Sequence, residues 1–117
     1  MTQPIILASA SDIRRQLLER AGVTVEVVPA RIDEEAIRAA LVAEDATPRD
    51  VADALAEYKA RKISEKRPEA LVIGCDQVLE FRGEVLSKPA DPDDARDQLR
   101  RLRAQRHKLL SAAVVYE

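Results

Sequence analysis

The sequence has one cysteine, no tryptophan, only 3% aromatic residues and no long apolar run. Because a single thiol cannot form an internal disulfide, the chain is not a disulfide-stabilised secreted module, and the lone Cys75 is consistent with a reducing cytosol. No stretch approaches the roughly 20 apolar residues that cross a bilayer, and no basic segment precedes the short apolar patch near the N-terminus. These absences predict a cytoplasmic protein without a membrane partner.

The chain also lacks a concentration of positive charge. Its 19 Lys and Arg residues are spread along the sequence against 21 Asp and Glu, which gives a net charge of −2. Nucleic-acid-binding domains usually gather basic residues, and single-strand binders add aromatic side chains on which bases stack. The composition therefore argues against polymeric nucleic acid as a partner, and it leaves open a small anion held by a few local basic groups.

What the sequence does contain is a regular alternation of strand-like and helix-like segments. Strands are predicted at residues 5–8, 23–28, 70–75 and 108–116, with a hairpin joining 78–81 to 84–87. Helices are predicted to begin at or just after Ser11, Asp33, Thr47 and Asp91. This alternation predicts one α/β layered domain over residues 1–117. The last strand has no covering segment after it, so we expect the chain to be the N-terminal part of a larger fold.

Apolar residues at helical spacing predict the face that each helix buries. The expected inward residues are Ile13, Leu17, Leu18 and Ala21 in the first helix, Val51, Leu55 and Tyr58 in the third, and Ala95, Leu99 and Leu102 in the last.

The turn between the first strand and helix is a candidate anion site. The N–H groups at a helix N-terminus attract anions, and Ser9, Ser11, Arg14 and Arg15 add donors suited to phosphate. A capped surface helix with solvated arginines explains the same residues about equally well. The segment lacks the glycines of a P-loop or a dinucleotide-binding turn, which excludes those two motifs.

A carboxylate follows the central apolar strand, in the segment Gly74-Cys75-Asp76-Gln77. At the carboxyl end of such a strand, Asp76 could hold Mg²⁺ or activate water, or it could simply bond the backbone of a turn. Gln77 could read a base edge or bridge two strands. Cys75 has no histidine partner and is a poor candidate nucleophile.

Two lysines and one further acid complete the candidates. Lys59 and Lys88 could act as point charges for phosphates, although a lysine taken singly is more often a surface residue. Glu34 is a first-turn helix acid that the helix dipole alone could explain. His107 has no second ligand at metal-binding spacing. The set fits metal-assisted attack of water on a phosphate chain and offers no covalent nucleophile.

Five segments in order resemble the Maf family of nucleoside triphosphate pyrophosphatases. The first, LASASDIRRQLL, resembles the family pattern L-A-S-x-S-P-R-R followed by a helix with two leucines. The segments are residues 7–18, 32–34, 55–60, 74–78 and 83–89. The resemblance spans nearly the whole chain. It implies a mixed twisted sheet with flanking helices in a two-lobed, Maf/ITPase-like architecture whose C-terminal part is lacking here, and a possible homodimer.

The resemblance also implies an activity: hydrolysis of a nucleoside triphosphate to its monophosphate and pyrophosphate with a divalent metal, Mg²⁺ or Mn²⁺. Carried over by position, Ser9 and Arg14 would bind phosphates, as would Lys59 and Lys88.

The same positions imply roles for the acids and for base selection. Glu34 would help to position metal or water, and Asp76 would be the proton acceptor and a metal ligand. The Asp76-Gln77 pair is similar to the branch acting on 7-methyl-GTP, which ties Gln77 and Ile13 to base choice. Asp12-Ile13 departs from the usual Pro-Arg or Pro-Trp, so the alternative is a catalytically impaired nucleotide-binding protein linked to cell division.

Overall fold

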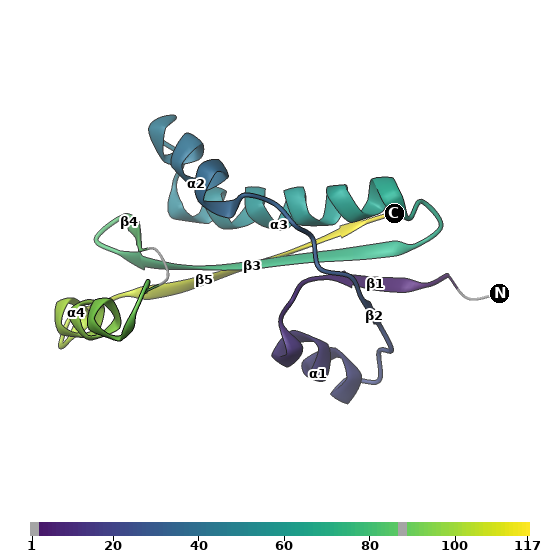
Figure 1. The fold of residues 1–117 in the computed structure, drawn as a ribbon, viewed down its shortest axis with the longest axis horizontal. Coiled ribbons are helices and arrows are strands. Elements are labelled where there is room, and N and C mark those ends of the chain that lie inside the picture. The colour runs from purple at the N-terminus through teal and green to yellow at the C-terminus, as the bar shows by residue number, and fades with distance from the viewer. Residues whose placement is uncertain (1–2, 87–88) are drawn as a thin grey trace.

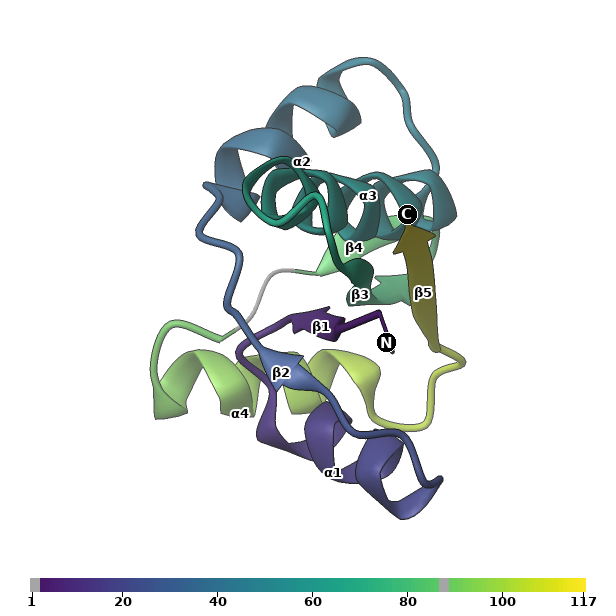
Figure 2. The ribbon, with the colours of Figure 1, turned by 90° about the vertical axis from the view of Figure 1, so that its right-hand side faces the viewer.

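The computed structural model describes residues 3–86 and 89–117, in which strands and helices alternate as predicted. The elements are β1 (Ile5–Ala8), α1 (Asp12–Arg20), β2 (Glu26–Val27), α2 (Glu34–Ala43), α3 (Pro48–Lys66), β3 (Leu71–Phe81), β4 (Glu84–Leu86), α4 (Pro92–Leu102) and β5 (Lys108–Tyr116). One mixed sheet lies between α2 and α3 on one face and α1 and α4 on the other (Figures 1 and 2). The predicted α/β fold with flanking helices is therefore confirmed.

β3 is the longest strand, and every strand except β2 pairs with it. β1 pairs in parallel with its residues 71–74, β4 antiparallel with 79–81, and β5 antiparallel with 72–80. Because β5 occupies one edge of β3 throughout, β1 and β4 must share the other edge. Residues 75–78 consequently have no described strand beside them on that edge, which leaves a gap in the sheet between β1 and β4.

α3 covers one face of the sheet along most of its length (Figure 1). A capping box fixes its start, since the Thr47 side chain accepts from the Asp50 N–H at 3.1 Å and the Asp50 carboxylate accepts from the Thr47 N–H. The buried residues on its inner face are Val51, Ala52, Leu55, Ala56, Lys59, Ala60 and Ile63. Lys59 is thus a charged residue on an otherwise apolar face.

Gly74 permits the close approach of α3 to β3. A Cβ at this position would lie 2.2 Å from the Ala56 carbonyl oxygen and 2.8 Å from Ala60 Cβ. Any larger residue would push helix and strand apart. With glycine there, the α3 residues between Ala56 and Ala60 come to lie against the strand just before Asp76.

The helices on the other face are much less buried than expected. Ile13 and Leu17 of α1 and Leu99 of α4 are 70%, 59% and 68% exposed. Every residue of α1 and α4 is described, and none of them is buried. The helical spacing correctly predicted these helices, but the prediction that these apolar side chains point into a core was wrong, because nothing in the described part of the chain covers them.

Three local expectations were also wrong. The strand predicted over 23–28 pairs only at Glu26–Val27, which lie opposite Ile6 and Leu7 of β1. Tyr58 is 44% exposed rather than inward, because the buried face of α3 is centred on Leu55 and Lys59. The predicted break after Cys75 is absent: β3 continues through Asp76 because β5 pairs with it on both sides of that residue.

None of the helices within the described ranges is both long and apolar enough to span a membrane.

Candidate active site

A lysine and two carboxylates meet beside the gap in the sheet. Lys59 Nζ lies 2.7 Å from Glu34 Oε1 and 3.1 Å from Asp76 Oδ1, and it donates to the Cys75 carbonyl oxygen at 3.4 Å. Lys59 and Asp76 are 8% and 6% exposed. Each of the three N–H donors of the ammonium group thus has an acceptor, which a buried charge requires. Lys59 therefore holds two acids from separate elements at one place.

One oxygen of this cluster has no partner. Asp76 Oδ2 is buried and receives no hydrogen bond from any described residue. A buried polar atom left without a partner costs about 1–3 kcal/mol. Water or a cation bound at this oxygen would remove that cost. The unsatisfied Oδ2 is therefore the point of the cluster most suited to a ligand.

The donors available here fit Mg²⁺ or Mn²⁺, both of which prefer oxygen ligands. Across residues 3–86 and 89–117, no group of three or more His, Cys, Asp or Glu side chains is placed to hold a metal ion. Mg²⁺ is nevertheless usually bound by one or two carboxylates, with waters and substrate phosphates completing its shell. Asp76 and Glu34 could supply that number.

The turn between β1 and α1 forms the other side of the gap. Ser9 Oγ accepts hydrogen bonds from the Ser11 N–H at 3.1 Å and from Arg14 Nη1 at 3.2 Å, and Arg14 Nη1 also lies 3.4 Å from the Cys75 carbonyl oxygen. Both lone pairs of Ser9 Oγ are then engaged, so its own proton is left to donate. A serine hydroxyl, an arginine and the start of a helix together suit a phosphate oxygen.

Asp12 does not oppose an anion here as strongly as its charge suggests. Its carboxylate accepts from Arg15 Nη2 at 2.7 Å and from Gln16 Nε2 at 2.6 Å. These hydrogen bonds, the one from Arg15 foremost, hold the pKa of the Asp12 carboxyl below its ordinary value. Arg15 also pairs with Glu19 at 2.8 Å. Arg15 is thus engaged along its own helix, and of these two arginines it is Arg14 that faces the gap.

A hollow of about 460 Å³ adjoins both groups, and Ile13, Arg14, Asp76 and Gln77 are among the residues that line it. Gln77 Nε2 donates to Ser111 Oγ at 3.2 Å, across the β3–β5 pair in which these two residues are opposite each other. Gln77 therefore bridges two strands and also faces the hollow. Ile13 contributes an exposed aliphatic side chain from the first turn of α1.

Cys75 lines the same hollow, but its side chain is a poor candidate nucleophile. Burial raises the pKa of its side chain, and the nearby charges of Arg14 and Lys59 offset only part of that effect. A protonated thiol is a weak nucleophile. The contribution of this residue to the site is its carbonyl oxygen, to which both Arg14 and Lys59 donate.

The structure brings together seven of the eight side chains predicted for the site: Ser9, Ile13, Arg14, Glu34, Lys59, Asp76 and Gln77. The eighth, Lys88, lies outside the described residues. Sequence reasoning missed Arg38 of α2, which lines a smaller hollow together with Gln77. Its spacing of four residues from Glu34, which places both on one helix face, is the signal that could have found it.

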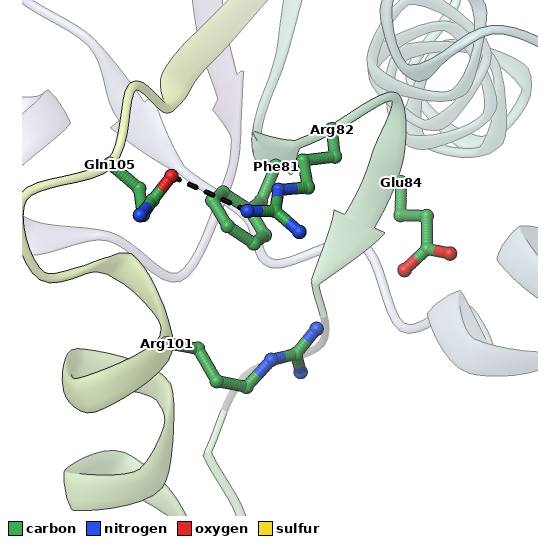
Figure 3. Close-up of a pocket in the computed structure, with 5 residues that line it drawn as sticks. All are labelled: Phe81, Arg82, Glu84, Arg101 and Gln105. Atoms are coloured by element: carbon green, nitrogen blue, oxygen red, sulfur yellow. Dashed lines mark hydrogen bonds between the residues drawn. The ribbon is translucent and has the colours of Figure 1, made fainter.

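A separate hollow of about 340 Å³ lies near the β3–β4 turn, and Figure 3 shows the five residues that line it. The guanidinium carbon of Arg82 is 5.0 Å from the centre of the Phe81 ring, and the same group donates to Gln105 at 3.4 Å. None of the seven predicted site residues that the structure describes lines this hollow. The gap beside β3, with its buried acids, is therefore the better candidate.

A family model and individual relatives of this chain point to the same protein family. A family model described as Maf-like protein matches residues 4–117. A nucleoside triphosphate pyrophosphatase of Ruegeria pomeroyi is 61% identical over 117 residues, which is 100% of this chain and 59% of the relative. A 7-methyl-GTP pyrophosphatase of Mesorhizobium japonicum is 51% identical over 115 residues, covering 98% of this chain and 58% of the relative. The chain thus spans less than two thirds of the length of these curated relatives.

Proposed function

The chain belongs to the family of Maf-like proteins, and from that premise we propose that it carries the reacting residues of a nucleoside triphosphate pyrophosphatase. The reaction is hydrolysis of a nucleoside triphosphate to its monophosphate and pyrophosphate. The observation that carries the proposal is Asp76, a buried carboxylate with one oxygen fixed by Lys59 and the other without a partner among the described residues. The printed names of the relatives, nucleoside triphosphate pyrophosphatase and 7-methyl-GTP pyrophosphatase, support it.

In this proposal the β1–α1 turn binds the phosphate chain. Ser9 donates its hydroxyl proton to a phosphate oxygen, since Ser11 and Arg14 already occupy its lone pairs. Arg14 adds charge from one guanidinium that is anchored on Ser9 and on the backbone of β3. Lys88 is proposed as a further phosphate contact on the family resemblance alone.

Asp76 accepts a proton from the attacking water through Oδ2. Lys59 orients Asp76 through Oδ1, and it holds Glu34 nearby to help position the water. A Mg²⁺ or Mn²⁺ ion bound by Asp76 and Glu34 would supply charge neutralisation on the phosphates and a more acidic water. Because its three N–H donors are engaged, Lys59 positions these acids and is not a phosphate ligand in this arrangement.

The hollow beside Gln77 is the proposed site of the base. Ile13 offers an aliphatic surface instead of a stacking ring, and the Gln77 amide, held by Ser111, offers hydrogen-bonding groups to a base edge. A 7-methylated purine is one candidate, because one group of relatives is named for that activity.

The test is a panel of canonical and modified nucleoside triphosphates, 7-methyl-GTP included, with Mg²⁺ or Mn²⁺ and detection of released pyrophosphate. Asp76→Asn is expected to lower turnover by at least about 100-fold, in line with the loss of a general base. Asp53→Asn, at an exposed position on α3, is the matched control and should leave turnover unchanged. If Asp76→Asn turns over substrate as fast as the unmodified chain, the proposal is wrong. Nucleotide binding without any pyrophosphate release would favour a nucleotide-binding protein instead.

A further inference from the structure

Arg38 of α2 carries a buried nitrogen for which the described part of the chain offers no hydrogen-bond acceptor. Its Nε atom is inaccessible to solvent and makes no hydrogen bond to any described residue. Other arginines of the chain, such as Arg15 and Arg67, are paired with carboxylates at 2.7 Å and 2.9 Å. A buried nitrogen of a charged group without an acceptor is unfavourable, and native proteins keep few of them.

The position of Arg38 relates it to the candidate site. It lies one helical turn after Glu34, and residues four apart share a helix face. Its side chain lines a hollow of about 200 Å³ whose walls include Gln77, Val78 and Leu79 of β3. These strand residues adjoin the gap that the β1–α1 turn borders from the other end. Arg38 thus approaches the gap from α2, and Arg14 approaches it from α1.

We propose that Arg38 is a phosphate-binding residue that contacts the polyphosphate chain from the side opposite to Arg14. The inference rests on the proposed function for the identity of the ligand. A guanidinium group presents N–H donors in a fork that matches two phosphate oxygens. Binding of a polyphosphate would supply the acceptor that Nε lacks. A packing role alone would leave that nitrogen without an acceptor among the described residues.

The decisive experiment compares affinity with stability in Arg38→Met, which keeps an unbranched apolar side chain and removes the guanidinium group with its charge. Affinity for inorganic pyrophosphate is measured by calorimetry in the presence of Mg²⁺, and stability by the thermal unfolding midpoint. We expect at least about 10-fold weaker pyrophosphate binding, the loss of one charge-assisted hydrogen bond, with an unchanged or higher midpoint. Arg49→Met, at an exposed position on α3, is the control and should change neither quantity.

Unchanged pyrophosphate affinity in Arg38→Met would overturn the inference, and a lowered midpoint alongside it would assign Arg38 to packing. If Arg38→Met fails to fold, Arg38→Lys decides: it keeps the charge but loses the fork, and we expect affinity to fall several-fold. Wild-type affinity in Arg38→Lys would then overturn the inference. Pyrophosphate binding is measured separately from turnover. If the chain binds pyrophosphate through Arg38 but hydrolyses no nucleotide, the proposed function is contradicted and the inference about Arg38 stands.

Discussion

The two faces of the sheet differ in how tightly they are packed. On one face α3 buries seven residues against β3, and Gly74 lets helix and strand come into direct backbone contact. On the other face α1 and α4 leave Ile13 and Leu99 mostly exposed. The acids that must be held in fixed positions, Asp76 and Glu34, are joined by Lys59 from the packed face. The residues proposed to bind a base border a hollow on the open face, where ligands of different size can be admitted.

The largest difference is expected between leucines on the two faces. Leu55 is fully buried on α3, so Leu55→Ala should lower the free energy of unfolding by about 3 kcal/mol through lost burial and a cavity. Leu17 of α1 is 59% exposed, so Leu17→Ala should lower the free energy of unfolding by no more than about 0.5 kcal/mol. Urea unfolding of both variants measures this. Equal losses would show that α1 is packed in solution as tightly as α3.

A second comparison is between two glycines, one where a side chain would have no space and one where the backbone conformation disfavours a side chain. Gly74→Ala places a methyl group 2.2 Å from the Ala56 carbonyl oxygen, which should cost about 3 kcal/mol as α3 is pushed away. Gly22→Ala has open space around it but a φ of +87°, so its cost should be about 1 kcal/mol. Only Gly74→Ala should also lower the proposed pyrophosphatase activity, because Lys59 moves with α3. Similar activity in both variants would contradict the link between packing and site.

Sequence patterns predicted local structure well where the signal is local. The caps at Ser11, Asp33 and Thr47 were confirmed, because a capping side chain bonds only to its own first turn. The β5 strand over Lys108–Tyr116 was confirmed as well. Strand pairing was less predictable, since the continuation of β3 through Asp76 depends on its pairing with a segment more than 30 residues away.

The site residues, too, were predictable where the signal lies in one short segment and less so where it depends on distant segments. Ser9 and Arg14 could be proposed from one short segment, whereas the grouping of Glu34, Lys59 and Asp76 came only from the ordered family motifs. The burial of Lys59 was not predictable from helical spacing alone, because the inner face of a helix usually carries apolar residues. Here that face carries a cation, which is stabilised by two acids.

A smaller effect is expected from the two helix caps. Thr47→Ala removes the cap of α3, and because that helix is coupled to the core, the free energy of unfolding should fall by about 1 kcal/mol. Ser11→Ala removes an equivalent cap from α1, which buries no residue fully. There the loss should appear as faster hydrogen exchange of α1 amides, with global stability changed by less than about 0.5 kcal/mol. A full 1 kcal/mol global loss in Ser11→Ala would place α1 in the same cooperative unit as α3.

The smallest effect concerns Cys75, which lines the hollow of the open face yet is partly shielded from solvent. Because burial raises the pKa of its thiol, less of it is ionised at a given pH than of a free cysteine, and the thiolate is the reactive form. Alkylation by iodoacetamide at pH 8 should therefore be roughly several-fold slower than that of glutathione, and its rate should still be rising above pH 9. Repeating the labelling in urea gives the control, since unfolding should restore ordinary reactivity. A rate that levels off below pH 8.5 in the folded chain would mean that Arg14 and Lys59 outweigh burial at this sulfur, and that the open face is more electropositive than its packing indicates.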